Sequence, residues 1–202
     1  MSSSDNGWRE LQKAAQVLQS MSIPFVVGGS LASSYHGQPR STNDADVMVA
    51  PFAGREQEFA DRFESYYYLS LPAMIEANRS RRSFNIINTT TGFKIDIFTQ
   101  KNRPYDAAIF ERKIAAQIDA VPFELPMLSP EDSILLKLEW YRLGHEASDR
   151  QWLDIRSVMQ AKWGRLDLPY LQHWATDLKV DDLLERALNE ATPEDTSLDE
   201  FP

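Results

Sequence analysis

Cysteine is absent from the 202-residue chain. Without thiols the protein has neither a disulfide framework nor a thiolate metal site, and this composition is compatible with a reducing compartment. Positive charge is also scarce, because 21 lysine and arginine residues face 30 aspartate and glutamate residues, which gives a net charge of −9. Affinity for phosphate backbones is built from clustered lysine and arginine. The charge balance therefore argues against a large nonspecific nucleic-acid footprint and leaves room only for a small basic patch.

Long hydrophobic runs are missing as well. No apolar stretch approaches the length of a transmembrane helix, and residues 1–6 lack the basic flank and apolar core of a signal peptide. We therefore expect a cytoplasmic protein with no membrane partner. Apolar residues make up 43% of the chain, and 202 residues suffice for one domain, or for one domain with a helical appendage, with a substantial core.

The strongest signal of function begins at a glycine turn. A short apolar run ends in Gly28, Gly29 and Ser30, where a helix is expected to begin. Glycines leave the backbone N–H groups unobstructed, and the dipole of the following helix favours negative charge. The pattern predicts a phosphate-binding turn.

Two acids follow this turn at the start of a second apolar run. Asp44 and Asp46 stand at i and i+2 of a predicted strand, so their side chains share one face. Two converging carboxylates repel each other unless a cation lies between them, and hard oxygen ligands beside a phosphate suit Mg²⁺. A calcium loop of the EF-hand type is excluded at 43–46, because its other ligands and its glycine are missing. The sequence therefore predicts a metal-dependent phosphate site.

A third acid lies in the strand-like stretch 93–98. Asp96 is the single carboxylate of that apolar segment, and a buried carboxylate without a partner is unfavourable. Lys94, two residues earlier on the same face, is one candidate partner.

The spacing of these residues resembles the signature of the nucleotidyltransferase superfamily, which has the DNA polymerase beta-like fold. In that signature a glycine pair is followed about a dozen residues later by Asp-x-Asp, and a third acid comes from a later strand. The resemblance implies an α+β fold, in which a small mixed β-sheet with flanking helices is followed by a helical C-terminal subdomain. It also implies that the Asp96 strand lies beside the strand of Asp44 and Asp46.

The resemblance further implies transfer of a nucleoside monophosphate from an NTP to an acceptor hydroxyl or phosphate. Asp44 and Asp46 would bridge two Mg²⁺ ions about 3.5–4 Å apart, and Asp96 would hold the ion at the acceptor and take its proton. Ser30 and the N–H groups after Gly29 would hold the terminal phosphates.

Arg40 and His36 flank this region. Arg40 either pairs with a carboxylate or reaches a polyphosphate, and the residues leave both interpretations open. His36, at a predicted helix end, either bonds a terminal carbonyl or has a direct chemical role.

Patterns of apolar residues and helix caps predict the other elements. Helices are expected at 7–20, 30–36 and 54–68, strands at 25–27, 44–49, 83–88 and 93–99, and a hairpin turn at 89–92; residues 100–128 are left unassigned. The cationic stretch 78–82 is expected to be a solvated loop or to line the cleft, since it precedes a strand next to that of Asp96.

At Ser129 the pattern becomes helical. Ser129, Pro130 and the two acids after them form a strong helix start, and further helices are expected at 148–162, from 168 and from 180. We therefore expect a nucleotidyltransferase core at 1–128, a helical subdomain at 129–190 and a disordered acidic tail at 191–202.

The helical part is similar to the C-terminal part of the AbiEii-type nucleotidyltransferases, which include toxins of abortive-infection systems. The residues that carry this likeness are the helix start at Ser129, Lys137 and Asp154. It implies that Lys137 acts in catalysis and that both charged residues reach the nucleotide, whereas the residues alone allow Lys137 to snorkel and Asp154 to pair with Arg150 or Arg156. The predicted nucleotide-binding set is Gly28, Gly29, Ser30, Arg40, Lys137 and Asp154.

The acceptor stays open at this stage. Candidates are tRNA, a protein or a small molecule, with a cognate antitoxin as a further partner. The acidic net charge suits a cationic aminoglycoside or an antitoxin at least as well as tRNA. An antibiotic-modifying enzyme and a noncatalytic partner-binding module with the same fold are the alternative functions.

Overall fold

The centre of the protein is a mixed β-sheet, seen in a computed structural model that describes residues 3–119 and 121–191. Within these ranges the sheet has seven strands in the order β3-β4-β5-β2-β1-β7-β6. The strands are β1 Phe25–Val27, β2 Asp44–Val49, β3 Tyr67–Leu69, β4 Ser83–Asn88, β5 Lys94–Thr99, β6 Ile114–Ala116 and β7 Leu125–Met127.

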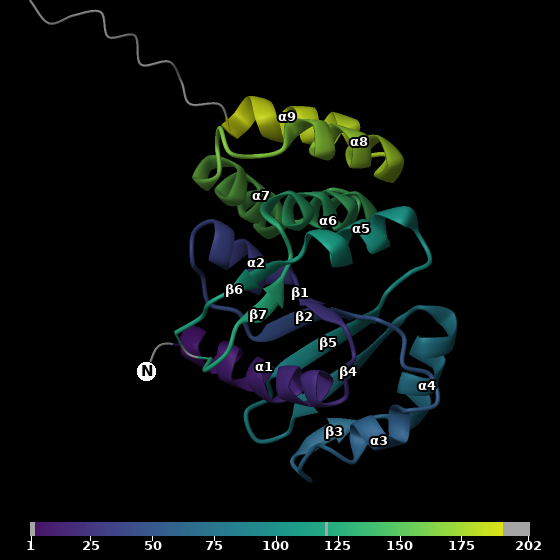
Figure 1. The fold of residues 1–202 in the computed structure, drawn as a ribbon. Coiled ribbons are helices and arrows are strands. Elements are labelled where there is room, and N and C mark those ends of the chain that lie inside the picture. Colours follow the sequence, from purple (N-terminus) through teal and green to yellow (C-terminus); the bar gives the residue numbers. More distant parts are fainter. Residues whose placement is uncertain (1–2, 120, 192–202) are drawn as a thin grey trace, which may run out of the picture.

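Helices cover both faces of the sheet (Figure 1). They are α1 Ser3–Ser20, α2 Gly29–His36, α3 Glu56–Ala60, α4 Leu71–Ser80, α5 Pro104–Arg112, α6 Pro130–Leu143, α7 Asp149–Ala161, α8 Leu168–Leu178 and α9 Asp181–Ala191. In Figure 1, α1, α3 and α4 lie on one side of the sheet, whereas α2 and the C-terminal helices are stacked on the other. This arrangement confirms the predicted fold class.

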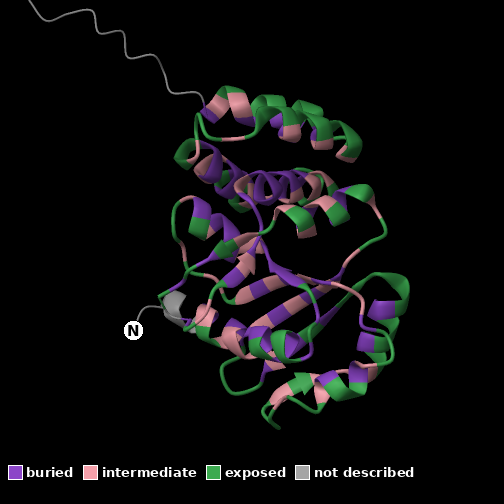
Figure 2. Ribbon diagram, viewed as in Figure 1, coloured by how far each residue is buried: buried purple, intermediate pink, exposed green. Residues whose placement is uncertain are grey.

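Strand alternation decides which face of the sheet is polar. In β2, Ala45, Val47 and Val49 are buried, while the acids between them are only partly buried. The same alternation holds along β5, and Figure 2 shows it as bands along the central strands. Because successive strand residues point to opposite faces, all acids of β2 and β5 face the side of the sheet that carries α2.

The register of the central strands confirms the predicted neighbourhood of the acids. Strands β2 and β5 run parallel, with Asp46 opposite Asp96 and Asp44 opposite Lys94. Strands β4 and β5 form the predicted hairpin, with Asn85 opposite Asp96.

The prediction of a helix over 54–68 is wrong after Ala60, where α3 ends. Only α3 is helical there, and Tyr67 instead pairs with Asn88 of β4, because aromatic residues favour a half-buried strand. The helix α4 was not predicted. Ser70 caps it by accepting from the Ala73 N–H, and Pro72 stands in its first turn, so the stretch 78–82 is the end of a helix and its left-handed cap rather than a loop.

The predicted C-terminal helices are confirmed. Ser129 accepts a hydrogen bond from the Asp132 N–H at the start of α6, and Ser148 accepts from the Gln151 N–H at the start of α7. Residues 100–128, left unassigned from the sequence, contain α5, β6 and β7. None of the described helices combines the length and apolarity needed to cross a membrane.

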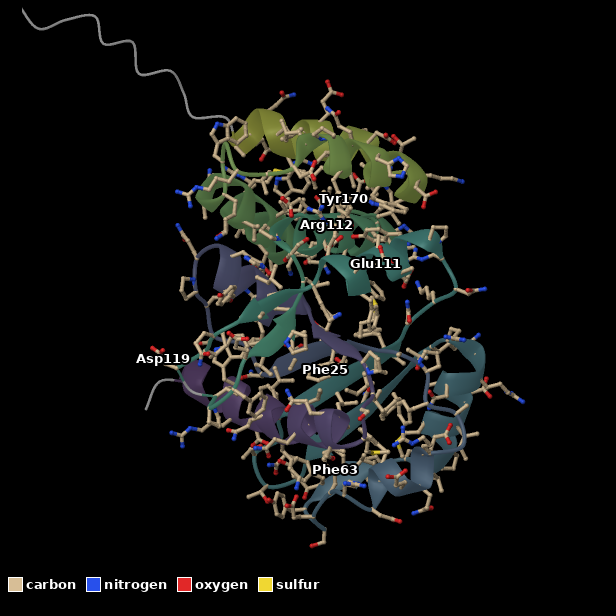
Figure 3. The ribbon with its side chains drawn as sticks, viewed as in Figure 1. Phe25, Phe63, Glu111, Arg112, Asp119 and Tyr170 are labelled. Atoms are coloured by element: carbon tan, nitrogen blue, oxygen red, sulfur yellow. The ribbon has the colours of Figure 1, made fainter. Side chains whose placement is uncertain are left out.

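The helix α8 is tied to α5 and α6 by aromatic and polar contacts. The Arg112 guanidinium lies 3.9 Å from the Tyr170 ring centroid, and the Tyr170 hydroxyl donates to Asp132 Oδ1 at 2.8 Å; Figure 3 shows Arg112 and Tyr170 close together. The division of the chain at residue 129 stays a prediction. Of the predicted tail, only Ala191 is described, as the last residue of α9; 192–202 lie outside the described residues.

Candidate active site

The predicted glycine turn connects β1 to α2. Gly28 donates its N–H to the Asp46 carbonyl oxygen at 2.8 Å, which fixes the turn against β2. Gly29 opens α2 with φ +58°, and a Cβ atom added to it would lie 1.7 Å from Asp46 Oδ2. Glycine is therefore required at position 29 both for its conformation and for its close approach to the carboxylate.

We expect Gly29→Ala to destabilise the protein and to weaken nucleotide binding. The left-handed conformation alone would cost about 1–2 kcal/mol, and the Asp46 side chain would also have to move. Gly92→Ala is the matched control, because Gly92 has φ +73° but its added Cβ would meet nothing within 4 Å. Equal losses of unfolding free energy in the two variants, measured by urea denaturation, would contradict a tight contact at Gly29.

Asp44, Asp46 and Asp96 share the polar face of the sheet. Burial raises the pKa of Asp46 to about 6, and the negative charges of Asp44 and Asp96 add to this effect. Asp44 Oδ1 accepts from the Thr42 hydroxyl at 2.5 Å. The shared effect on Asp46 places the three carboxylates within electrostatic reach of one another.

Asp96 has protein partners of its own. Lys94 Nζ lies 2.7 Å from Asp96 Oδ2. This ion pair confirms Lys94 as the partner that the sequence suggested for Asp96. On the neighbouring strand, Asn85 donates to Asp96 Oδ1 at 2.9 Å when its amide nitrogen is turned toward the acid. Both oxygens of Asp96 are thus within hydrogen-bond distance of a protein donor.

The donor set has the chemistry of a Mg²⁺ site, since carboxylate oxygens are ligands that Mg²⁺ uses. A cation would also relieve the repulsion from Asp44 and Asp96 that adds to burial in raising the pKa of Asp46. In the described part of the chain, no group of three acidic, histidine or cysteine side chains is already arranged to hold a metal ion. Asp44 Oδ1 and Asp96 Oδ2 are instead bound by Thr42 and Lys94.

A network of cations stands beside the glycine turn. Arg40 binds Asp154 with two hydrogen bonds, Nε to Oδ1 and Nη2 to Oδ2, both 2.8 Å long. Lys137 Nζ donates to Asp154 Oδ2, also at 2.8 Å. Arg40 Nη2 further donates to the Ser30 hydroxyl at 2.5 Å. Asp154 therefore holds two cations at the start of α2.

This network shows the carboxylate partners of its members, and contact of Arg40 with a polyphosphate stays a prediction. Arg40 pairs with the carboxylate of Asp154. The predicted pairing of Asp154 with Arg150 or Arg156 is wrong, because the ion-pair partners of Asp154 are Arg40 and Lys137. Arg156 instead pairs with Glu190. Burial alone would raise the pKa of Asp154, but the hydrogen bond from Arg40 and the charge of Lys137 outweigh it and lower that pKa. The hydrogen bonds that Arg40 donates to Asp154 in turn raise the pKa of Arg40.

His36 is buried away from these charges. Its Nε2 lies 2.8 Å from the Leu128 carbonyl oxygen, on the segment that leads into α6. Burial lowers the pKa of His36, so the ring is neutral near pH 7. This arrangement favours the structural interpretation of His36, with a carbonyl from a distant segment in place of a terminal carbonyl of its own helix.

A cavity of about 630 Å³ collects most of the predicted site residues. Those lining it are Gly28, Gly29, Ser30, Arg40, Asp44, Asp46, Lys137 and Asp154. Asp96 lies next to Asp46 but outside the lining. Phe98 and Trp140 also line the cavity, and neither was predicted as a site residue. Their spacing could have indicated them. Phe98 stands two residues after Asp96 and so shares its strand face, and Trp140 stands three residues after Lys137 and so shares its helix face.

Comparison with known proteins identified similar folds among solved structures. Neither the family models nor the curated proteins gave a match. The crystal structure of ANT(2")-Ia in complex with adenylyl-2"-tobramycin is similar over 85% of this chain and 95% of that one, with 14% identity and a TM-score of 0.54. An antigenic nucleotidyltransferase-like protein from Paracoccidioides brasiliensis is similar over 93% of this chain and 94% of that one, with 15% identity and a TM-score of 0.52. The chain therefore has the nucleotidyltransferase fold.

Proposed function

We propose that the protein is a Mg²⁺-dependent nucleotidyltransferase, which moves a nucleoside monophosphate from an NTP to an acceptor. The observation that carries this proposal is the register of the two central strands. It sets Asp46 beside Asp96 on one face, directly under the glycine turn of Gly28 and Gly29. A phosphate-binding turn and a carboxylate cluster are the two parts that nucleotidyl transfer requires.

In this proposal the carboxylates of Asp44, Asp46 and Asp96 would hold the metal ions. Bound Mg²⁺ would supply neutralisation of charge on the attacking and leaving oxygens. Asp96 would accept the proton of the acceptor hydroxyl at a carboxylate oxygen.

The chain itself positions the triphosphate. The first N–H groups of α2 have no acceptor within the helix and are available to a phosphate together with the Ser30 hydroxyl. Arg40 and Lys137 bring positive charge to the same end of the cavity and are held in place by Asp154. These residues orient the substrate and stabilise its charge, which is the main task of a protein in phosphoryl chemistry.

Incubation with each of the four NTPs, labelled at the α-phosphate, tests the proposal. The reactions contain Mg²⁺ and separate pools of tRNA, cell protein and aminoglycosides. We expect label to enter one pool and to require both Mg²⁺ and Asp46. Binding of a nonhydrolysable NTP to the wild type and to Asp46→Asn, with and without Mg²⁺, is measured beside the labelling. Equal affinity in all four cases would show that the proposed site is wrong. The noncatalytic module with this fold would then be the better interpretation.

Antibiotic modification is a second candidate function, favoured by the fold similarity to ANT(2")-Ia, which was solved with adenylylated tobramycin. The AbiEii-type resemblance supports a third, a toxin that modifies tRNA or protein and is paired with an antitoxin. The labelling pools separate the two, because only antibiotic modification places the label on the aminoglycoside.

For Asp96, we expect Asp96→Asn to lower transfer by about 100-fold or more while NTP binding is kept, since the amide loses the charge that accepts the acceptor proton. Lys94→Met is the control, because it removes the same ion pair but leaves the carboxylate. A transfer assay and calorimetry with a nonhydrolysable NTP are the measurements. If both variants only lose stability, on the order of 1 kcal/mol, and keep transfer, Asp96 is a structural partner of Lys94.

A further inference from the structure

The cavity has a second cationic end, away from the glycine turn. Arg81, Arg82 and Lys101 line it there, at the start of β4 and just after β5. Figure 1 shows these segments, near the end of α4 and the loop before α5, on the right of the sheet, whereas α2 is on the left. The cavity thus has one group of cations at the glycine turn and a second group near the end of α4.

These three cations are exposed and have no ion-pair partner among the described residues, although the charge of Arg82 contributes to lowering the pKa of Glu76 after the larger effects of the hydrogen bonds from Ser80 and Arg79. No ion pair joins them to a carboxylate in the described part of the chain, and Arg81 donates only to the Gln100 carbonyl oxygen, at 3.0 Å. Their neighbour Arg103 differs, since it binds both Asp106 and Glu139 at 2.5 Å. In a protein with a net charge of −9, three cations without a described ion-pair partner in one cavity indicate a site for an anion.

Aromatic side chains lie between this end and the acids. Phe98 follows Asp96 by two strand residues, about 7 Å, and stands opposite both Met48 and Ser83. Trp140 of α6 contacts Phe98 with ring centroids 5.8 Å apart and is 46% exposed. A large exposed ring in a cavity next to cations is the arrangement that stacks a base and holds its phosphate.

We propose that the acceptor is a nucleotide unit, whose phosphate binds Arg81, Arg82 and Lys101 while its base stacks on Trp140. Its sugar hydroxyl then reaches Asp96 and Asp46. This inference rests on the proposed function. The hydroxyl oxygen forms a bond to the α-phosphorus of the NTP, the bond from that phosphorus to the bridging oxygen breaks, pyrophosphate leaves with the electron pair, and the hydroxyl proton passes to Asp96.

The same charges disfavour a polycationic acceptor. An aminoglycoside placed at this end would face three like charges, and like-charge juxtaposition is unfavourable. The net charge of the whole chain suits a cationic acceptor, but the charges that line the cavity decide its contents because they are closest to it.

Direct binding measurements test the inference. The probes are a single-stranded RNA trinucleotide with a free 3′-hydroxyl, a nucleoside 5′-monophosphate, the unphosphorylated nucleoside and tobramycin, each with Mg²⁺ and a saturating nonhydrolysable NTP. We expect one or both phosphate-bearing probes to bind more tightly than the nucleoside and tobramycin. Equal binding of trinucleotide and monophosphate indicates a free nucleotide as the acceptor, whereas tighter binding of the trinucleotide indicates a polynucleotide end.

Variants locate the binding. Arg82→Gln with Lys101→Gln should weaken the phosphate-bearing probes about tenfold or more and lower the slope of log affinity against log salt by about two. Trp140→Leu should weaken them without changing that slope. Arg79→Gln is the matched control, since Arg79 lies on α4 three residues before Arg82, pairs with Glu76 and does not line the cavity.

The outcomes separate this inference from the proposed function. Unchanged probe binding in the double variant, or preferred binding of tobramycin, overturns the nucleotide acceptor while Asp46-dependent binding of NTP still supports the transferase. Loss of Asp46-dependent NTP binding would instead overturn both.

Discussion

Asp46→Asn is expected to abolish nucleotidyl transfer and, in metal-free buffer near pH 8, to raise the stability of the folded protein. Transfer is lost because the amide lacks the charge that holds the metal ions. Stability rises because the wild-type carboxylate is ionised at this pH although burial and the charges of Asp44 and Asp96 disfavour ionisation. A pKa raised from 3.8 to about 6 corresponds to a gain on the order of 2–3 kcal/mol.

The same shift gives a pH dependence with a definite sign. The folded-state pKa of Asp46 lies above its unfolded value, so between about pH 4 and pH 6 the native state binds more protons than the unfolded state. The contribution of Asp46 to the free energy of unfolding therefore falls as pH rises through this window, and it stays low above it. Asp46→Asn should remove this part of the slope.

Urea denaturation from pH 4 to pH 8, with EDTA, measures the effect. Asp177→Asn is the control for a lost charge, because Asp177 is exposed on α8, far from the sheet. A less stable Asp46→Asn at pH 8, or one with full NTP-dependent transfer, would refute the carboxylate cluster. Adding Mg²⁺ should stabilise the wild type but not the variant, since a ligand that binds only the native state stabilises it.

The second large effect is expected at Asp154. Asp154→Asn should lower the free energy of unfolding by about 3–5 kcal/mol, because breaking a buried ion pair leaves its partner charged and unpaired. The Lys137 side chain is only 10% exposed, and its ammonium group would keep no acid partner from this network. The affinity for NTP should fall as well, since Arg40 and Lys137 would no longer be held at the glycine turn.

A matched control distinguishes the loss of stability caused by burial from the loss caused by breaking a bidentate ion pair. Asp182 also binds one arginine, Arg142, through both carboxylate oxygens, but it is exposed. Asp182→Asn should therefore cost less than about 1 kcal/mol. Combining Asp154→Asn with Lys137→Met should restore part of the stability, as it removes the unpaired cation. Similar small losses in both aspartate variants would show that Asp154 is not the centre of the network.

The sequence by itself determined the features that depend on neighbours a few residues apart. The glycines before Ser30 predicted a turn into a helix, and alternation put Asp44 and Asp46 on one face. The serine at 129 predicted the start of α6, and the helical pattern from 148 predicted α7. These follow from backbone geometry and local hydrogen bonds, which repeat at fixed spacings. Superfamily resemblance added the pairing of β2 with β5.

Tertiary structure alone decided the contacts between distant segments. Asp154 and Arg40 are 114 residues apart, and local spacing instead suggested Arg150 or Arg156 as partners of Asp154. Strand β3 also escaped prediction, because its pairing with β4 overrode the weak helical pattern at 54–68. The cation cluster formed by Arg81, Arg82 and Lys101 exists only because the start of β4 meets the end of β5. Which charges meet across such a cavity depends on strand register and helix packing, which no local pattern encodes.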